Sequence, residues 1–186
     1  MKKFILKYVI FVILIAVIFS GCSIKPGSPT GNNANQDLKV SKNAFLLNTF
    51  NTITLYGTDD TSYFEEIYNE VERLENKLSM HISGSEVALI NDNAGVQPVK
   101  VSTETFEVIA KSIEYATLSE GLFDITIGPL VTLWGIGTES PRVPEQAEID
   151  AALQLIDFKN IILDHENITV FLTEKNMSID LGAIAK

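Results

Sequence analysis

Apolar residues recur along the chain in two patterns, and these predict both strands and helices. Residues 44–56 are rich in β-branched and aromatic side chains that alternate along the segment, which predicts a strand region. Residues 62–78 carry apolar side chains at helical spacing, so we expect an amphipathic helix there. Ser62 and Glu65 have the spacing of a capping box at the start of this helix.

The middle of the chain predicts a loop, a short strand and a second long helix. Residues 79–95 show no clean period and predict a loop, with one helical turn around residues 87–91. Residues 99–102 predict a short strand, and Ser102 can cap the helix that follows. Gly121 suits the left-handed position after that helix. The predicted buried stripe of this second long helix consists of Phe106, Ile109, Ala110, Ile113 and Ala116.

The last third of the chain predicts one helix and three strands. Pro144 suits the first turn of a helix that continues to about residue 156. Residues 161–163 and 168–172 predict a hairpin, with His165 exposed in its turn, and residues 177–181 predict a last strand. Residues 182–186 resemble a turn into a helix. This mixed order predicts an α+β fold, with a mixed or antiparallel sheet and packed helices.

One stretch, residues 119–137, is too apolar for a solvated loop and too rich in glycine for an ordinary core strand. It contains a single acid, Asp124, which needs a partner because an unpaired buried charge is costly. Two interpretations stay open. Either this is a strand and a turn whose Asp caps the backbone, or its backbone forms a cradle for a planar, phosphate-bearing ligand.

The start of the chain predicts export and a lipid anchor. A basic segment, residues 1–7, precedes the apolar run of residues 8–19, which is short for a bilayer span of about 20 residues. Small residues then precede Cys22, and together they resemble a bacterial lipobox, which implies lipidation of Cys22 with diacylglycerol and a fatty acid such as palmitate. The alternative is an uncleaved membrane anchor. Both place the domain on the extracytoplasmic face of the cell membrane.

Composition sets further bounds on the predicted domain. We assign residues 1–21 to a lipoprotein signal peptide, residues 22–42 to a flexible polar tether and residues 43–186 to the folded domain. The chain has a formal charge of −10, and removing the three lysines of the signal peptide leaves −13. This acidity argues against nucleic-acid binding. With Cys22 the only cysteine, no intrachain disulfide can form.

Three motifs together resemble the ApbE family of FAD:protein FMN transferases. Residues 119–135 read SEGLFDITIGPLVTLWG, similar to the family's S-x-G-x-F-D-I-T-x-G-P-L-x-x-L-W-G run. Residues 177–186 read MSIDLGAIAK, similar to D-L-G-[AG]-I-A-K, and Ser85-Glu86 with Ile90-Asn91 resembles S-E-[IV]-x-x-[IL]-N. The motifs occur in family order, and the resemblance spans roughly residues 45–186. It implies an ApbE-like, T-fold-related domain.

The resemblance also implies a set of site residues. His81 matches a position where the family has Tyr or a similar ring against the flavin, although a lone histidine is more often structural. Ala183 matches a residue whose backbone carbonyl binds magnesium. The residues that match FAD contacts are Leu47, His81, Leu122, Phe123, Asp124, Asp180 and Lys186.

The activity implied by the resemblance is transfer of FMN from FAD to a threonine hydroxyl of an extracytoplasmic target protein, with release of AMP and dependence on Mg²⁺. Two alternatives are hydrolysis of FAD to FMN and AMP, and a non-catalytic flavin-binding lipoprotein. Family members usually continue for over a hundred further residues. The resemblance therefore implies a C-terminally truncated, N-terminal fragment with an incomplete magnesium site.

Overall fold

An antiparallel hairpin opens the part of the chain that this computed structural model describes, residues 38–185. Strand β1 (Lys39–Leu46) pairs with β2 (Thr49–Tyr56), so the single strand region expected over residues 44–56 is two strands. The expected tether also ends earlier, because residues 39–42 belong to β1. Backbone pairing of Lys39 with Tyr56 explains this, since a ladder does not require apolar side chains.

The long helix α2 (Tyr63–Leu78) follows the hairpin, as the apolar spacing predicts. The expected capping box at Ser62 does not form, and the Ser62 side chain makes no cap hydrogen bond. The Asp60 carboxylate binds Ser62 instead. Asp60 Oδ1 accepts hydrogen bonds from the Ser62 N–H (2.9 Å) and from the Ser62 hydroxyl (2.7 Å).

The next elements follow the predicted order closely. The expected helical turn is α3 (Glu86–Asp92), where Ser85 Oγ accepts a hydrogen bond from the Ala88 N–H at 3.0 Å. The short strand β3 (Val99–Lys100) leads into α4 (Thr103–Leu118). Gly121 has φ 86°, the left-handed conformation expected after that helix.

The glycine-rich stretch is helical, so its interpretation as a strand is wrong. A 3₁₀ turn, η1 (Ile125–Ile127), continues into α5 (Gly128–Trp134). Pro129 lies in the first turn of α5, where its missing N–H costs nothing. Gly135 ends the helix at φ 65°.

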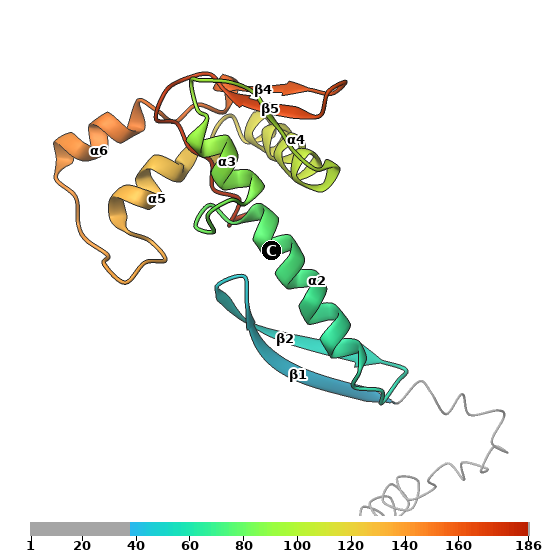
Figure 1. Cartoon of the computed structure of the whole chain (residues 1–186). Coiled ribbons are helices and arrows are strands. Elements are labelled where there is room, and N and C mark those ends of the chain that lie inside the picture. Colours follow the sequence, from blue (N-terminus) through green and yellow to red (C-terminus); the bar gives the residue numbers. More distant parts are fainter. Residues whose placement is uncertain (1–37, 186) are drawn as a thin grey trace, which may run out of the picture. The chain divides into compact units, whose positions relative to one another are not determined.

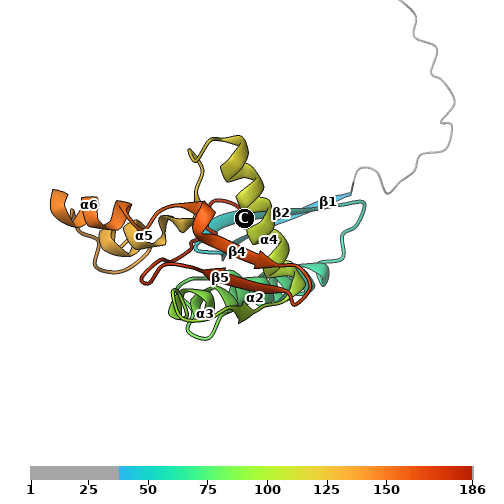
Figure 2. The ribbon, with the colours of Figure 1, turned by 90° about the horizontal axis from the view of Figure 1, so that it is seen from above.

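The second sheet carries most of the core. Helix α6 (Gln146–Leu153) and the 3₁₀ turn η2 (Phe158–Asn160) precede β4 (Ile161–Asp164) and β5 (Thr169–Leu172), which form the expected hairpin with His165 exposed. The strand order is β3-β5-β4, all antiparallel. In Figures 1 and 2, α3 and α4 lie against one face of this sheet. Buried residues there include Val87, Ile90, Phe106, Ile109, Val170 and Leu172.

Residues 177–181, expected to form a strand, do not form one, although buried residues alternate along the segment as they would in a strand. Met177, Ile179 and Leu181 are buried, but the segment belongs to neither a strand nor a helix, and its backbone pairs outside any sheet. The Asp180 N–H donates to the Ile125 carbonyl (2.8 Å), and the Ala185 N–H donates to the Leu181 carbonyl (2.9 Å), which closes a helical turn.

The arrangement confirms the α+β class. Within residues 38–185, no helix has the length and apolar character needed to cross a membrane. The signal peptide, Cys22 and Lys186 lie outside the described residues.

Candidate functional site

A cavity of about 190 Å³ lies where five segments of the chain meet, and we call it the main cavity. The hairpin turn contributes Leu47 and Asn48, and the end of α2 contributes Glu75 and Leu78. The loop after α2 contributes Ser79, Met80 and His81. Helix α5 and the loop after it contribute Val131, Ile136 and Gly137. The last described segment completes the wall with Asp180, Leu181, Gly182 and Ala185.

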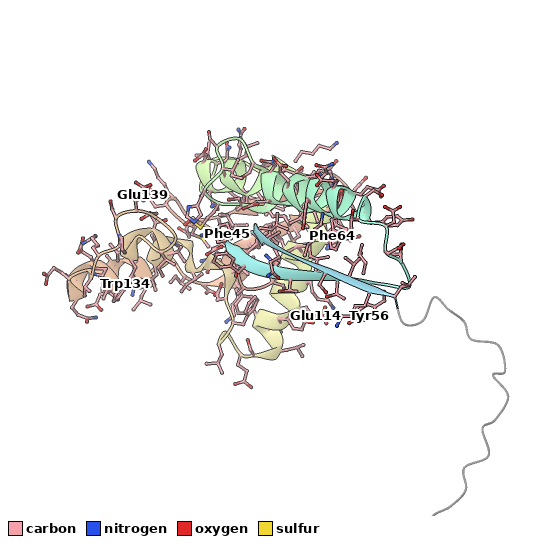
Figure 3. All side chains as sticks on the ribbon, turned by 90° about the horizontal axis from the view of Figure 1, so that it is seen from below. Phe45, Tyr56, Phe64, Glu114, Trp134 and Glu139 are labelled. Carbon is pink, nitrogen blue, oxygen red and sulfur yellow. The ribbon has the colours of Figure 1, made fainter. Side chains whose placement is uncertain are left out.

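The main cavity extends toward the hairpin. A hollow of about 260 Å³ shares the hairpin turn, His81 and Gly137 with it, and adds Phe45 and Ile82. Figure 3 shows Phe45 at the turn end of the hairpin and Tyr56 at the other end. Phe45 forms an edge-to-face pair with Phe50, with ring centroids 5.1 Å apart. This side of the site is therefore apolar and aromatic.

The hairpin turn is held at the cavity by Glu75. Leu47 and Asn48 both have positive φ, 53° and 54°, as a tight two-residue hairpin turn requires. This conformation is unfavourable for a bulky residue such as Leu47. The Leu47 N–H donates to Glu75 Oε2 at 3.4 Å, and Asn51 Nδ2 donates to the carbonyl of Leu46 at 2.9 Å.

Close approach of three loops narrows the cavity at Gly137. A Cβ at this position would lie 3.4 Å from Asn48 Nδ2 and 3.8 Å from His81 Nε2. Gly137 also has φ 77°, so a side chain would strain the backbone. The His81 side chain is exposed, and its backbone N–H donates to Ser79 Oγ at 3.1 Å. This places the His81 imidazole at the cavity wall with access to a ligand.

Asp180 presents a carboxylate to the main cavity. Its Oδ1 accepts a hydrogen bond from the Gly182 N–H at 2.8 Å, which closes a turn between these residues. Within residues 38–185, Oδ2 of Asp180 makes no hydrogen bond with another residue. Together with Glu75, Asp180 makes the cavity acidic, so the cavity favours hydrogen-bond donors over phosphate at these two positions.

A second hollow, of about 440 Å³, is lined by Tyr115, Leu118, Ser119, Phe123, Ala183 and Ile184. The last described segment therefore lines both spaces, with Asp180 to Gly182 at the main cavity and Ala183 and Ile184 at the second hollow. Phe123 packs edge-to-face against Tyr115, with centroids 6.5 Å apart. This hollow is mainly apolar.

Asp124 uses its carboxylate to hold the backbone. Oδ1 accepts hydrogen bonds from the Thr126 N–H (2.8 Å) and the Thr126 hydroxyl (2.7 Å), and Oδ2 accepts one from the Phe158 N–H (2.9 Å). This geometry matches the open alternative of a capping Asp, although the capped element is helical. It joins η1 to η2 across 34 residues.

The predicted site residues thus fall into groups. Leu47, His81 and Asp180 line the main cavity, whereas Phe123 and Ala183 line the second hollow. Leu122 is 94% exposed on the segment after α4. The roles of these residues, and those of Asp124 and of Lys186, which lies outside the described residues, stay predictions.

The acids of the described residues provide at most part of a magnesium site. No group of three His, Cys, Asp or Glu side chains between residues 38 and 185 is arranged to hold a metal ion. Magnesium prefers six oxygen ligands in near-octahedral geometry. Asp180 and the exposed Ala183 are near neighbours in one turn and could supply oxygen atoms to such a site.

Two groups of surface ion pairs lower the pKa of a carboxyl, and neither group lines the main cavity. Lys77 and then Arg73 lower the pKa of Glu104 to about 2, and these pairs link α2 to the start of α4. Arg142 lowers the pKa of Glu148 to about 2 at the start of α6. These groups brace helices.

Sequence reasoning missed Glu75, Asn48 and Gly137. Glu75 looks like an ordinary solvated position on an amphipathic helix, and its contact with Leu47 spans 28 residues. Asn48 offered a signal, because Asn favours positive φ in hairpin turns, but Leu47 before it is unusual there. The sequence pattern identifies Gly137 only as one glycine of the glycine-rich stretch.

Comparisons with known proteins agree on one family. A model described as "ApbE family" matches residues 47–186. The chain is 36% identical over 146 residues to a protein of Klebsiella pneumoniae named FAD:protein FMN transferase, covering 78% of this chain and 46% of that protein. A protein of the same name from Vibrio cholerae is 30% identical over 130 residues, covering 69% and 38%.

Solved structures support the same relationship. The crystal structure of the ApbE protein from Thermotoga maritima superposes with a TM-score of 0.73 at 32% identity, covering 80% of this chain and 48% of that one. The flavin transferase ApbE from Vibrio cholerae gives a TM-score of 0.72 at 27% identity, covering 80% and 50%. The chain spans about half the length of these relatives, or less.

Proposed function

Because the chain belongs to the ApbE family, we propose that it forms the flavin-binding part of an FAD:protein FMN transferase. One observation carries this proposal. Leu47, His81 and Asp180, which the sequence separates by up to 133 positions, line the same cavity. The family resemblance predicts that each of them contacts FAD from a different segment of the chain.

The main cavity suits the ring portion of a flavin. Its wall combines apolar side chains, including Leu78, Met80 and Ile136, with the carboxylates of Glu75 and Asp180. A planar ring gains from apolar contact, and its N–H groups or the ribityl hydroxyls can donate to a carboxylate. The phosphates would lie away from these two acids, because like charges repel.

The proposed reaction is transfer of FMN to a threonine hydroxyl of a target protein. The hydroxyl oxygen attacks the FMN phosphorus, a new P–O bond forms, and the bond to the bridging oxygen of the diphosphate breaks. AMP leaves with that oxygen, and the hydroxyl proton is released. Binding and orientation of the flavin would be the contribution of Leu47, His81 and Asp180.

We also propose that the reaction depends on Mg²⁺, because the diphosphate charge must be neutralised for AMP to leave. The Ala183 carbonyl is the predicted protein ligand. We propose that the protein acts at the extracytoplasmic face of the cell membrane through a lipid on Cys22, since small residues precede this cysteine as in a lipobox. Its partners would be FAD and a threonine-bearing redox protein.

Titration calorimetry of the full chain with FAD, with and without Mg²⁺, tests the proposal. We expect Asp180→Asn to weaken FAD binding and Asp150→Asn, on the outer surface of α6, to leave it unchanged. Equal affinity of the wild-type chain and Asp180→Asn for FAD would contradict the assignment of this cavity.

Release of AMP from FAD separates the possible activities. AMP that appears only with a threonine-bearing target protein supports the transferase. AMP without a target indicates hydrolysis of FAD, and FAD binding without AMP indicates a flavin-binding protein.

A further inference from the structure

The segment that carries Asp180 is held by a side chain from another part of the fold. Asn91 lies near the end of α3, and its Oδ1 accepts a hydrogen bond from the Ile179 N–H at 2.8 Å. Its Nδ2 donates to the Ile179 carbonyl at 3.1 Å. One side-chain amide therefore satisfies both backbone groups of Ile179, as a neighbouring strand would in a sheet.

The residue after Ile179 is fixed from the other side. The Asp180 N–H donates to the carbonyl of Ile125 in η1 at 2.8 Å. The Ile179 side chain is fully buried. The segment thus has a defined place on both sides without belonging to a strand, and this place brings the Asp180 carboxylate to the main cavity.

Asn91 has few possible substitutes in this role. A carboxylate can accept from the Ile179 N–H but cannot donate to its carbonyl, and an apolar side chain can do neither. Asn93, two residues on, has a different role, because its Nδ2 donates to the Leu89 carbonyl of the same helix and its Oδ1 accepts from Gln97. The same residue type therefore provides a matched control.

We propose that Asn91 is a positioning residue for the flavin dinucleotide, acting by holding Ile179 so that Asp180 faces the main cavity. This inference rests on the proposed function and extends it to a residue that lines none of the three spaces described above. It also gives a role to the Ser85–Asn91 motif, which none of the predicted flavin contacts explains.

The first test compares Asn91→Asp with Asn93→Asp in the full chain. We expect faster hydrogen exchange of the Ile179 amide in Asn91→Asp, because the carboxylate meets the Ile179 carbonyl without a proton to donate and the two oxygens repel each other, which opens the contact with the N–H as well. For the same reason we expect FAD affinity to fall about tenfold. Asn93→Asp should change neither quantity. Unchanged exchange at Ile179 in Asn91→Asp would overturn the inference.

A general loss of stability must be separated from positioning. Val87→Ala removes buried volume from the same helix and provides a destabilised control. If Val87→Ala lowers FAD affinity as much as Asn91→Asp at a similar midpoint of unfolding, Asn91 has only a structural role.

A double-mutant cycle decides whether Asn91 acts through Asp180. We expect Asn91→Asp to have little further effect on FAD affinity in the Asp180→Asn background. Both substitutions would remove the same interaction, that of the Asp180 carboxylate with FAD. Additive losses would overturn the inference. If the wild-type chain binds no FAD, the proposed function itself fails, which the wild-type titration shows independently of the variants.

Discussion

The turns at Asp124 and Asp180 are alike in local structure and differ in the second oxygen of the carboxylate. In each, Oδ1 accepts a hydrogen bond at 2.8 Å from the N–H two residues ahead, Thr126 in one case and Gly182 in the other. Asp124 Oδ2 then accepts from the distant Phe158 N–H, whereas Asp180 lines the main cavity and its Oδ2 makes no hydrogen bond to another residue between 38 and 185. The two turns therefore share a local motif but use the second carboxylate oxygen differently.

The largest effect should come from removing the Asp124 carboxylate. Asp124→Ala leaves the half-buried Phe158 N–H and the Thr126 groups without their acceptor, so we expect the free energy of unfolding to fall by about 3 kcal/mol. Urea denaturation followed by circular dichroism measures this. A loss below about 1 kcal/mol would show that the three hydrogen bonds, of which the one from the Phe158 N–H joins η1 to η2, contribute little to stability.

The corresponding substitution at Asp180 should have a small effect on stability and a large effect on FAD affinity. Asp180→Ala removes one local hydrogen bond, so we expect a loss of about 1 kcal/mol in unfolding free energy. We expect at least a tenfold loss in FAD affinity, because the cavity loses its acceptor. Calorimetry on the two alanine variants measures this contrast. Comparable stability losses for the two would remove the distinction between the turns.

A substitution in the hairpin turn should have a smaller effect, and it also separates stability from FAD affinity. Leu47 has φ 53°, which costs about 1 kcal/mol in a residue with a side chain, and glycine adopts it freely. We expect Leu47→Gly to leave stability unchanged or to raise it by up to about 1 kcal/mol, and to weaken FAD binding through the lost apolar contact. Tighter FAD binding by Leu47→Gly would show that the leucine side chain hinders the flavin.

The smallest expected effect is on the pH dependence of stability, and it comes from Glu104, which belongs to neither turn. Lys77 and Arg73 lower the pKa of Glu104 from 4.5 to about 2, so its contribution to stability is present above pH 4.5 and lost as pH falls toward 2. We expect Glu104→Gln to make stability depend less steeply on pH in this range, and added salt to reduce the difference. Identical pH dependence in both proteins would show that the pairs contribute nothing measurable.

The helices and the hairpin of the core were predictable because their apolar spacing is regular. The stripe of α4 and the strands β4 and β5 follow from local pattern alone, and the structure places them near the expected residues. The alternation at Met177, Ile179 and Leu181 also indicated burial correctly. It could not show that the partner of this segment is the Asn91 side chain, 88 residues away, and not a strand.

Other differences arise where two local signals compete. Ser62 and Glu65 have capping-box spacing, but Asp60 takes the Ser62 hydroxyl. Residues 125–134 are rich in β-branched and aromatic side chains, yet the Asp124 turn and Pro129 start a helix. At the site, the motifs named Asp180 and His81, while Glu75 stayed hidden because a contact from a helix to a hairpin turn leaves no local pattern.

The most direct test of the central claim is a map of FAD binding by amide chemical shifts in the full chain. We predict that FAD shifts the amide signals of Leu47, His81 and Asp180, which line the main cavity, and leaves those of α6 unchanged. Shifts confined to residues outside the main cavity, or no shifts at saturating FAD, would contradict the account.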